Sequence, residues 1–547
     1  MKALRNTILA LAVAFGFNAC DVLDFSPTDR YNEMTIWSTK QNIESYVAGF
    51  YSTAEVYGEF GARSFGTASF STDALTWMLK YSSDVAGYGT PNLLLFVENQ
   101  ISPSSNVLSY WADCYVRIRK INEFLEGIDE NCTVLSETEK NAYKAEVRFF
   151  RGYLYFLLTR AHHSVILYDR LADWQNSAKA RSSEEDCWKF VKEDLEFAYN
   201  NLPEAKLTSG RVDKGTAAAL LTRAMLFAED YDTVIDYAKK VIEIGYSLDP
   251  DYAAVFKSNA AKRSSESIFQ VDYINESYSH TYDSKNAPSG DDPNAQGHCV
   301  APTQEMVEHY ETKDGNYINW SSLAPDTDLS TVYSQLEPRF HASVLYNGAS
   351  WKGRTIETFV GGRDGYSKYG DQGVPKTTVT GYYAKKLLDE SNTTFTTTKS
   401  IQSYVAIRYA EVLLNYAEAL ILSSSQKNIK LAMDQINAVR DRVGLPAVSA
   451  ADAKTAMSHL MHEREIELAF EGFHYWDLKR WGTARELLDG ASFHGLKITK
   501  ATSGTTFQYE DCDFGQKRLF PEKYYSLPIP DTELTNNPLC EQLDEWK

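Results

Sequence analysis

The residues most able to do chemistry gather in one C-terminal stretch. Histidines and acids concentrate there as His459, His462, Glu463, Glu467, Glu471, His474 and Asp477. Such side chains could hold a metal ion or transfer protons. A zinc protease needs His-Glu-x-x-His on one helix face, whereas this stretch reads His-Glu-Arg-Glu-Ile. Charged neighbours on a helix commonly form ion pairs, so we interpret the stretch as structural and expect no catalytic residue, metal or cofactor.

The rest of the chain carries no specific catalytic signature. It has no Gly-x-Ser-x-Gly elbow and no Gly-x-x-x-x-Gly-Lys-Ser/Thr phosphate loop. The loop at 291–297 resembles a calcium loop, but Thr303 stands where its last acidic ligand belongs, so we interpret it as a turn. A glycoside hydrolase needs two carboxylates across a cleft, and none of the 74 acids stands out as such a pair. Surface-associated glycoside hydrolysis therefore stays an alternative.

Charge and aromatic content narrow the class of ligand. The 547 residues include 55 Lys and Arg against 74 Asp and Glu, a formal net charge of −19. Nucleic-acid binding needs a basic face, so we expect no nucleic-acid partner. The chain has 35 Tyr, 26 Phe and 10 Trp. Such a Tyr-rich composition suits flat, amphipathic ligands such as sugars, although Tyr is also an ordinary core residue.

The first twenty residues predict export and a lipid anchor. Lys2 and Arg5 precede an apolar run at residues 7–17, which is too short to span a bilayer but fits a signal peptide. The run ends in Ala19-Cys20, which resembles a bacterial lipoprotein cleavage site with lipidation of Cys20. An ordinary secretory signal with a chance cysteine is the alternative. The other six cysteines have irregular spacing, so disulfides and buried free thiols both stay open.

Helical periodicity covers most of the chain outside its middle. Apolar residues repeat at helical spacing over 42–55, 107–127, 139–160, 183–201, 214–228, 231–245, 407–422, 428–443 and 453–470. The pair 214–228 and 231–245 has the length and small residues (Ala218, Ala224 and Ala238) of a tetratricopeptide-like hairpin. Residues 407–443 predict a second such hairpin.

Residues 251–400 have a different character. The helical period fades there, and Gly, Pro, Asp, Asn, Ser and Tyr cluster in long segments. Long loops inside a compact protein are usually functional or disordered, and their many aromatics argue against disorder. We therefore predict an irregular lobe on a helical scaffold, and we expect the binding site in this lobe.

Motifs in order along the chain resemble the SusD/RagB family of outer-membrane nutrient-binding lipoproteins. The N-terminal motifs are Cys20-Asp-Val-Leu-Asp, Tyr110-Trp-Ala-Asp-Cys-Tyr and Glu146-Val-Arg-Phe-Phe-Arg. The C-terminal ones are stronger, and include Ile407-Arg-Tyr-Ala-Glu, Arg440-Asp-Arg-Val-Gly, Glu463-Arg-Glu-Ile-Glu and Phe470-Glu-Gly-Phe-His-Tyr-Trp-Asp-Leu-Lys-Arg-Trp. The chain ends in Leu527-Pro-Ile-Pro and Asn537-Pro. These motifs span nearly the whole mature chain.

The resemblance implies a mostly α-helical fold with tetratricopeptide-like hairpins and an irregular, loop-rich lobe. It implies a signal peptide at 1–19, a lipidated linker at 20–40, helical parts at 41–250 and 401–547, and a ligand-binding lobe at 251–400. The implied function is non-catalytic capture of an oligosaccharide and its delivery to a SusC-like TonB-dependent outer-membrane porin. The protein would be lipid-anchored in the outer membrane and face the exterior. A peptide or another nutrient is the alternative cargo.

The resemblance also implies a ligand face built from two segments. The first offers Asp73, Trp77 and Tyr81, and the second offers Tyr282, Asn286 and His298. Trp320 and Trp351 lie in neighbouring polar loops, where a large aromatic is harder to explain as core. The alternative for each ring is packing beneath a loop.

Overall fold

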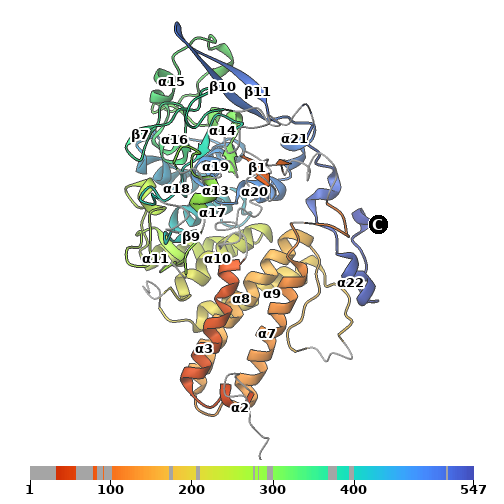
Figure 1. The fold of residues 1–547 in the computed structure, drawn as a ribbon. Helices are drawn as coiled ribbons and strands as arrows, with labels where there is room; N and C mark the ends of the chain where they lie inside the picture. The colour runs from red at the N-terminus through yellow and green to blue at the C-terminus, as the bar shows by residue number, and fades with distance from the viewer. Residues whose placement is uncertain are drawn as a thin grey trace, which may run out of the picture.

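The computed structural model describes residues 33–56, 78–82, 90–91, 101–106, 108–171, 177–204, 210–274, 278–280, 282–291, 300–366, 378–393, 400–512, 515 and 517–547. Helices dominate, as the sequence predicts. The N-terminal helices form one end of the molecule, and the middle and C-terminal parts of the chain form the other (Figure 1). No helix within the described ranges combines the length and the apolar character that a bilayer crossing requires.

Helix α8 is the centre of the N-terminal end. This part consists of α2 (Glu33–Ile36), α3 (Lys40–Phe50), α4 (Ser52–Val56), α7 (Trp111–Glu130), α8 (Glu137–His162) and α9 (Glu184–Asn201). A capping box between Ser136 and Glu139 begins α8, and every residue from Phe149 to His162 is buried because α3, α7 and α9 pack around it. The predicted helices at 107–127, 139–160 and 183–201 are confirmed, whereas that at 42–55 is interrupted at Tyr51.

Helical hairpins continue the scaffold. They are formed by α10 (Lys214–Phe227) with α11 (Tyr231–Ile244) and by α17 (Tyr409–Leu422) with α18 (Ile429–Arg442). Helix α19 (Ala453–Glu467) packs on α17 and α18, and α20 (His474–Arg480) follows it in the chain. Ala218, Ala224 and Ala238 are fully buried, which confirms the close approach predicted for the first hairpin. The buried Arg223 guanidinium on α10 donates two 2.6 Å hydrogen bonds to Glu411 on α17, and so joins the two hairpins.

Two helix boundaries differ from the prediction. Residues Tyr404–Arg408 form strand β9, which pairs antiparallel with β3 (Ser267–Val271), so α17 begins at Tyr409 and not at 407. The helix predicted to continue to 470 ends at Glu467, and Phe470 takes a left-handed φ of 67°. A short buried strand that runs into an apolar helix gives one continuous apolar pattern, which periodicity alone does not divide.

The middle of the chain consists of short elements, as predicted. Its helices are α12 (Tyr252–Val255), α13 (Tyr282–Asn286), α14 (Gln304–Glu308), α15 (Leu329–Gln335) and α16 (Pro338–Ser343), with a 3₁₀ turn at Trp320–Ser322. Its strands besides β3 are β4 (Val300–Pro302), β5 (Val344–Leu345), β6 (Ser350–Trp351), β7 (Arg354–Thr355) and β8 (Tyr383–Ala384). β5 pairs with β8 and β6 with β7, all antiparallel.

The C-terminal part contains a β-hairpin that the helical prediction did not include. It has α21 (Ala484–Leu488), the antiparallel pair β10 (His494–Ala501) and β11 (Gly504–Asp511), and α22 (Asp531–Asn536), besides short 3₁₀ turns. Figure 1 shows the hairpin at the end of the molecule opposite α2 and α3. Gly381 and Gly495 let residues 379–381 lie against β10, since a Cβ on Gly381 would come within 2.3 Å of the Leu496 carbonyl oxygen.

Two apolar cores hold these parts together. The larger joins the N-terminal helices, the helical hairpins and the β3–β9 pair, and the smaller lies among α14–α16, α20 and the β10–β11 hairpin. The five cysteines in the described residues are buried free thiols: Cys114, Cys132, Cys187, Cys512 and Cys540. Of the two alternatives for the cysteines, the structure therefore supports free thiols for these five.

Candidate functional site

Strand β1 (Met78–Ser82) pairs the chain of the first predicted ligand segment with the chain that follows the second. It pairs antiparallel with β4, so that Met78 opposes Pro302 and Lys80 opposes Val300, and its other edge pairs with β2 (Thr90–Pro91). The backbone of Tyr81 thus lies in a sheet with the chain that follows the second segment. Asp73, Trp77 and His298 fall outside the described residues, as does the side chain of Tyr81.

The other four predicted ligand residues are buried. Tyr282, Asn286, Trp320 and Trp351 are 6%, 2%, 3% and 1% exposed. For Trp320 and Trp351 this burial favours the alternative, packing beneath a loop, over a ring open to a sugar. Trp320 packs against Tyr333 in the smaller core, with 6.2 Å between ring centroids. None of these side chains presents an open face to a sugar in this structure, and their ligand role stays a prediction.

An arginine clamp lies within the loop-rich lobe. Arg354 donates to Asp291 (2.6 and 3.1 Å) and to Asp364 (2.6 and 2.7 Å). Asp291 also accepts the Trp351 indole N–H at 2.7 Å, and the Gly290 amide donates to Asp364 at 3.1 Å. The clamp therefore joins the chain after α13 to the β6–β7 hairpin and to the segment before residue 367. The Asp291 carboxylate is bound by Arg354 and Trp351, whereas residues 292–297 of its loop fall outside the described residues, so the interpretation of that loop as a turn stays a prediction.

Asp283 on α13 is a buried acid held on both sides of its carboxylate. One carboxylate oxygen accepts the Asp389 amide at 2.8 Å, and the other accepts the Asn392 side-chain amide at 3.1 Å. Burial is the main cause that raises its pKa to about 7, and these hydrogen bonds oppose the rise. Asp283 thus fixes α13 against the turn at 389–392 and changes its charge near neutral pH.

Because the pKa of Asp283 is raised in the folded protein, we expect the stability of the protein to depend on pH. In the unfolded chain the Asp283 carboxyl titrates near its ordinary value of 3.8, so between about pH 4 and pH 7 the folded protein binds more protons. The free energy of unfolding should therefore fall as pH rises through this window and level off above it. We expect Asp283→Asn to remove about 2–4 kcal/mol of this decline in urea titrations at pH 4 to 8. Asp326→Asn, at an exposed acid, is the matched control, and an unchanged decline in Asp283→Asn would contradict this assignment.

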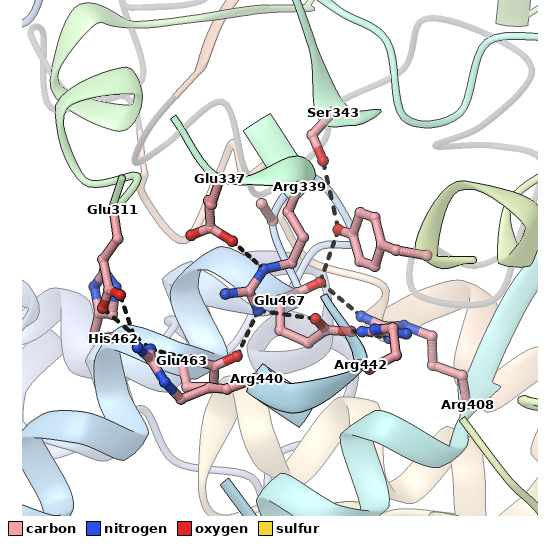
Figure 2. Close-up of polar contacts among 12 residues, drawn as sticks. Glu311, Glu337, Arg339, Ser343, Arg408, Arg440, Arg442, His462, Glu463 and Glu467 are labelled. Carbon is pink, nitrogen blue, oxygen red and sulfur yellow. Dashed lines mark hydrogen bonds and ion pairs between the residues drawn. The ribbon is translucent and has the colours of Figure 1, made fainter. Parts of the chain in front are cut away.

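The acid- and histidine-rich C-terminal stretch forms buried ion pairs. Figure 2 shows Glu463 and Glu467 on α19 facing a set of arginines that come from other elements. Glu467 accepts from Arg408 at 2.6 Å and from Arg339 at 3.1 Å, and Glu463 accepts from Arg440 at 3.2 Å. The ion pairs predicted for this stretch are thus confirmed.

The other charged residues of this network are also paired with residues of opposite charge. Arg408 also donates to Glu266 at 2.7 Å and to Glu471 at 2.8 Å, and Lys386 donates to Glu471 at 2.7 Å. The network joins Glu266 just before β3 and Lys386 after β8 to β9, α16, α18, α19 and the turn before α20. Within the described part of the chain, no group of three or more His, Cys, Asp or Glu residues is placed to hold a metal ion.

Sequence reasoning did not find the Arg354 clamp or the role of Asp283. Arg354 lies 63 residues from Asp291, and Asp283 lies 106 residues from Asp389. The sequence shows that this irregular segment contains charged residues, but it does not show which of them contact one another.

Comparison with known proteins places the chain in one family. The pattern that defines the SusD family matches residues 265–546, and a second, described as "Starch-binding associating with outer membrane", matches residues 21–226. A curated relative, SusD-like protein P2 of Formosa agariphila, is 24% identical, and the match covers 98% of both chains. The chain belongs to the SusD family.

Solved structures agree with this assignment. A SusD-like protein from Bacteroides fragilis has a TM-score of 0.76 at 26% identity, with 94% of this chain and 98% of that chain covered. A SusD-like carbohydrate-binding protein from the same organism has a TM-score of 0.76 at 24% identity, with 92% and 99% covered. A laminarin-binding SusD-like protein has a TM-score of 0.63 at 22% identity, again with 92% and 99% covered. The helical SusD-like fold expected from the sequence is therefore confirmed.

Proposed function

We infer that this protein binds an oligosaccharide at the cell surface and delivers it, uncleaved, to a SusC-like TonB-dependent porin. The observation that carries this proposal is membership of the SusD family over both halves of the chain. The carbohydrate-binding and laminarin-binding proteins among its structural neighbours support a glycan as the cargo.

The ligand face proposed here is the region around the β2–β1–β4 sheet. Strand β1, which continues the first segment, pairs with β4, which follows the second segment, and Arg354 and Asp283 hold parts of the lobe together. Rigid support of this kind favours binding, because a preorganised site orders fewer groups when the ligand arrives. Sugar C–H faces would stack on aromatic rings there, and sugar hydroxyls would pair with short polar side chains.

No observation favours hydrolysis as a second function. The acids of the C-terminal stretch are ion-paired and buried, so they are unavailable to a substrate. Arg354 likewise engages Asp291 and Asp364 in the lobe. These contacts support a binding protein without catalytic carboxylates at either place.

The anchor and the partner are tested together. We expect tagged wild-type protein to incorporate a fatty-acid analogue and to copurify with a TonB-dependent porin in mild detergent. Cys20→Ala should lose the label and leave the membrane fraction, because Cys20 is the proposed lipidation site and the apolar run before it is too short to span a bilayer. Unlabelled wild type would contradict the lipid anchor. Wild type recovered from native membranes without a porin would contradict the partner.

A further inference from the structure

A cavity of about 670 Å³ lies among the N-terminal helices. Its walls come from α7, α8 and α9 and from the chain between α8 and α9, and within the described chain they share no residue with the β2–β1–β4 sheet. Figure 1 shows α7, α8 and α9 side by side at the end of the molecule opposite the β10–β11 hairpin. A cavity of this volume falls within the range of small-molecule sites.

A buried hydrogen-bond network supports this cavity. Arg151 on α8 is 5% exposed and donates to both carboxylate oxygens of Asp194 on α9, at 2.7 and 2.8 Å. It also donates to the Asn122 side chain on α7 at 2.7 Å and to the Asp169 carbonyl oxygen at 2.9 Å. One side chain thus joins the three helices to the chain between α8 and α9, so the walls are fixed before a ligand arrives.

Arg148 on α8 offers an accessible donor to the cavity that it lines. Its Nε donates to Asp194 at 2.6 Å, its Nη2 donates to the Glu193 carbonyl oxygen at 3.3 Å, and its guanidinium lies 4.1 Å from the ring centroid of Phe197. These contacts hold a side chain that is 23% exposed. Its Nη1 keeps accessible surface and makes no hydrogen bond within the described chain. Two N–H groups are therefore available to a ligand.

Other accessible groups line the same cavity. The side-chain amide of Asn141, seven residues before Arg148 on α8, is half-buried and makes no hydrogen bond to the described residues. Asp169 is exposed, and in that part of the chain its carboxylate accepts no hydrogen bond either. Phe190 and Phe197 are half-buried and lie two turns, or about 10 Å, apart on one face of α9. Rings beside such polar groups are the usual combination in a sugar site.

The charges around the cavity select the class of ligand. Its acids are all exposed, and they are Asp129, Asp169, Asp186 and Glu193. Its cations besides the two arginines are Lys144, Lys179 and Lys189. An anionic ligand would lie near the carboxylates and a cationic one near the lysines, so the mixture disfavours both. A neutral ligand rich in hydroxyl groups suits it, because a hydroxyl both donates to a carboxylate and accepts from a cation.

We propose that this cavity is a second glycan site, which binds a neutral oligosaccharide. Sugar hydroxyls pair with Arg148, Asn141 and Asp169, and an apolar sugar face packs against the phenylalanine rings of α9. The glycan part of this assignment rests on the proposed function. Its position rests on the accessible groups that have no partner within the described chain.

Hydroxyl-radical footprinting of the mature protein locates the site. Maltotriose and laminaritriose are the probes, and mass spectrometry measures the oxidation of single aromatic side chains. We expect at least one of these two trisaccharides, at saturation, to lower the oxidation of Phe190 and Phe197 at least twofold. Tyr509, 39% exposed on the β10–β11 hairpin, should be unaffected and is the control ring. Equal oxidation of Phe190 and Phe197 with and without both trisaccharides would overturn the proposal.

Two variants test the polar contacts by titrating the protection of Phe190 with trisaccharide. Asn141→Ala should raise the half-protecting concentration about twofold to tenfold, as for loss of one hydrogen bond, and its side chain has no described partner to lose. Arg148→Met should raise it at least tenfold, and it should fold because Asp194 keeps both hydrogen bonds from Arg151.

The matched control for these variants is Asn200→Ala, at an exposed residue of α9 outside the cavity walls. It should leave the half-protecting concentration unchanged. A half-protecting concentration unchanged in both Asn141→Ala and Arg148→Met would overturn the proposal.

Ligand charge tests the neutral class. Trigalacturonic acid should need at least a fivefold higher concentration than the neutral trisaccharide for the same protection of Phe190, because its carboxylates approach the four exposed acids. Protection at an equal or lower concentration would overturn the neutral class.

The result is separable from that of the proposed function. Trisaccharide binding measured by calorimetry without protection of Phe190 and Phe197 would overturn this site alone. Protection of these rings accompanied by new reducing ends would support this site and contradict the uncleaved delivery in the proposed function.

Discussion

Arg408→Met should lower the free energy of unfolding by about 3–5 kcal/mol at pH 8. Arg408 is 1% exposed and donates hydrogen bonds to three carboxylates, those of Glu266, Glu467 and Glu471. Methionine keeps most of the side-chain volume, so the loss is mainly electrostatic. The three acids would then stay buried with fewer cations, which is more costly than the intact network.

The pH dependence of this loss identifies its cause. Arg408 is one of the cations that hold the pKa of Glu467 and Glu471 below the ordinary value for a glutamate. Without Arg408 these pKa values rise, so the folded variant binds more protons than wild type and its stability falls further as pH increases. The difference between Arg408→Met and wild type should therefore be smaller at pH 5 than at pH 8 in urea titrations.

An exposed arginine supplies the control. Arg485 pairs with Glu522 at 3.1 Å while both side chains are more than half exposed, so Arg485→Met should change stability by less than about 0.5 kcal/mol. A loss in Arg408→Met equal to that in Arg485→Met, or a loss independent of pH, would contradict the described network.

Trp351→Ala should lower the free energy of unfolding by about 3–5 kcal/mol, because it empties a large volume in the interior. The ring is 1% exposed, and its indole N–H donates to Asp291 at 2.7 Å. Trp351→Phe keeps most of the packing and loses this hydrogen bond, so we expect a smaller loss of about 1–2 kcal/mol. Thermal and urea unfolding of the two variants separates the packing and hydrogen-bond contributions.

Tyr317→Ala is the matched aromatic control, because that ring is 59% exposed. Its stability should change by less than about 1 kcal/mol. Glycan affinity of folded Trp351→Ala provides the second readout. Unchanged affinity with lost stability assigns the ring to packing, whereas unchanged stability with lost affinity would contradict its buried position.

Local patterns predicted the helices well. The Ser136 capping box, the Ser183 cap and the left-handed Gly245 after α11 mark ends that the sequence indicates directly. The start of α17 was missed, because β9 is defined by pairing with β3, more than a hundred residues earlier. A helix boundary that is set by strand pairing with a distant segment cannot be predicted from the local spacing of apolar residues.

The candidate site was harder to predict for a related reason. The polar neighbours of Trp320 and Trp351 make a core position hard to predict locally, because the ring contact of Trp320 with Tyr333 and the hydrogen bond of Trp351 to Asp291 come from other segments.

Glycan binding measured together with product formation tests the central claim most directly. The mature protein is applied to a glycan array that includes starch and laminarin oligosaccharides. Each hit is then titrated by calorimetry, and the same mixtures are assayed for new reducing ends. We predict saturable binding of at least one oligosaccharide with no new reducing ends. Reducing ends that increase in proportion to protein, or no binding to any glycan, would contradict a non-catalytic glycan-binding function.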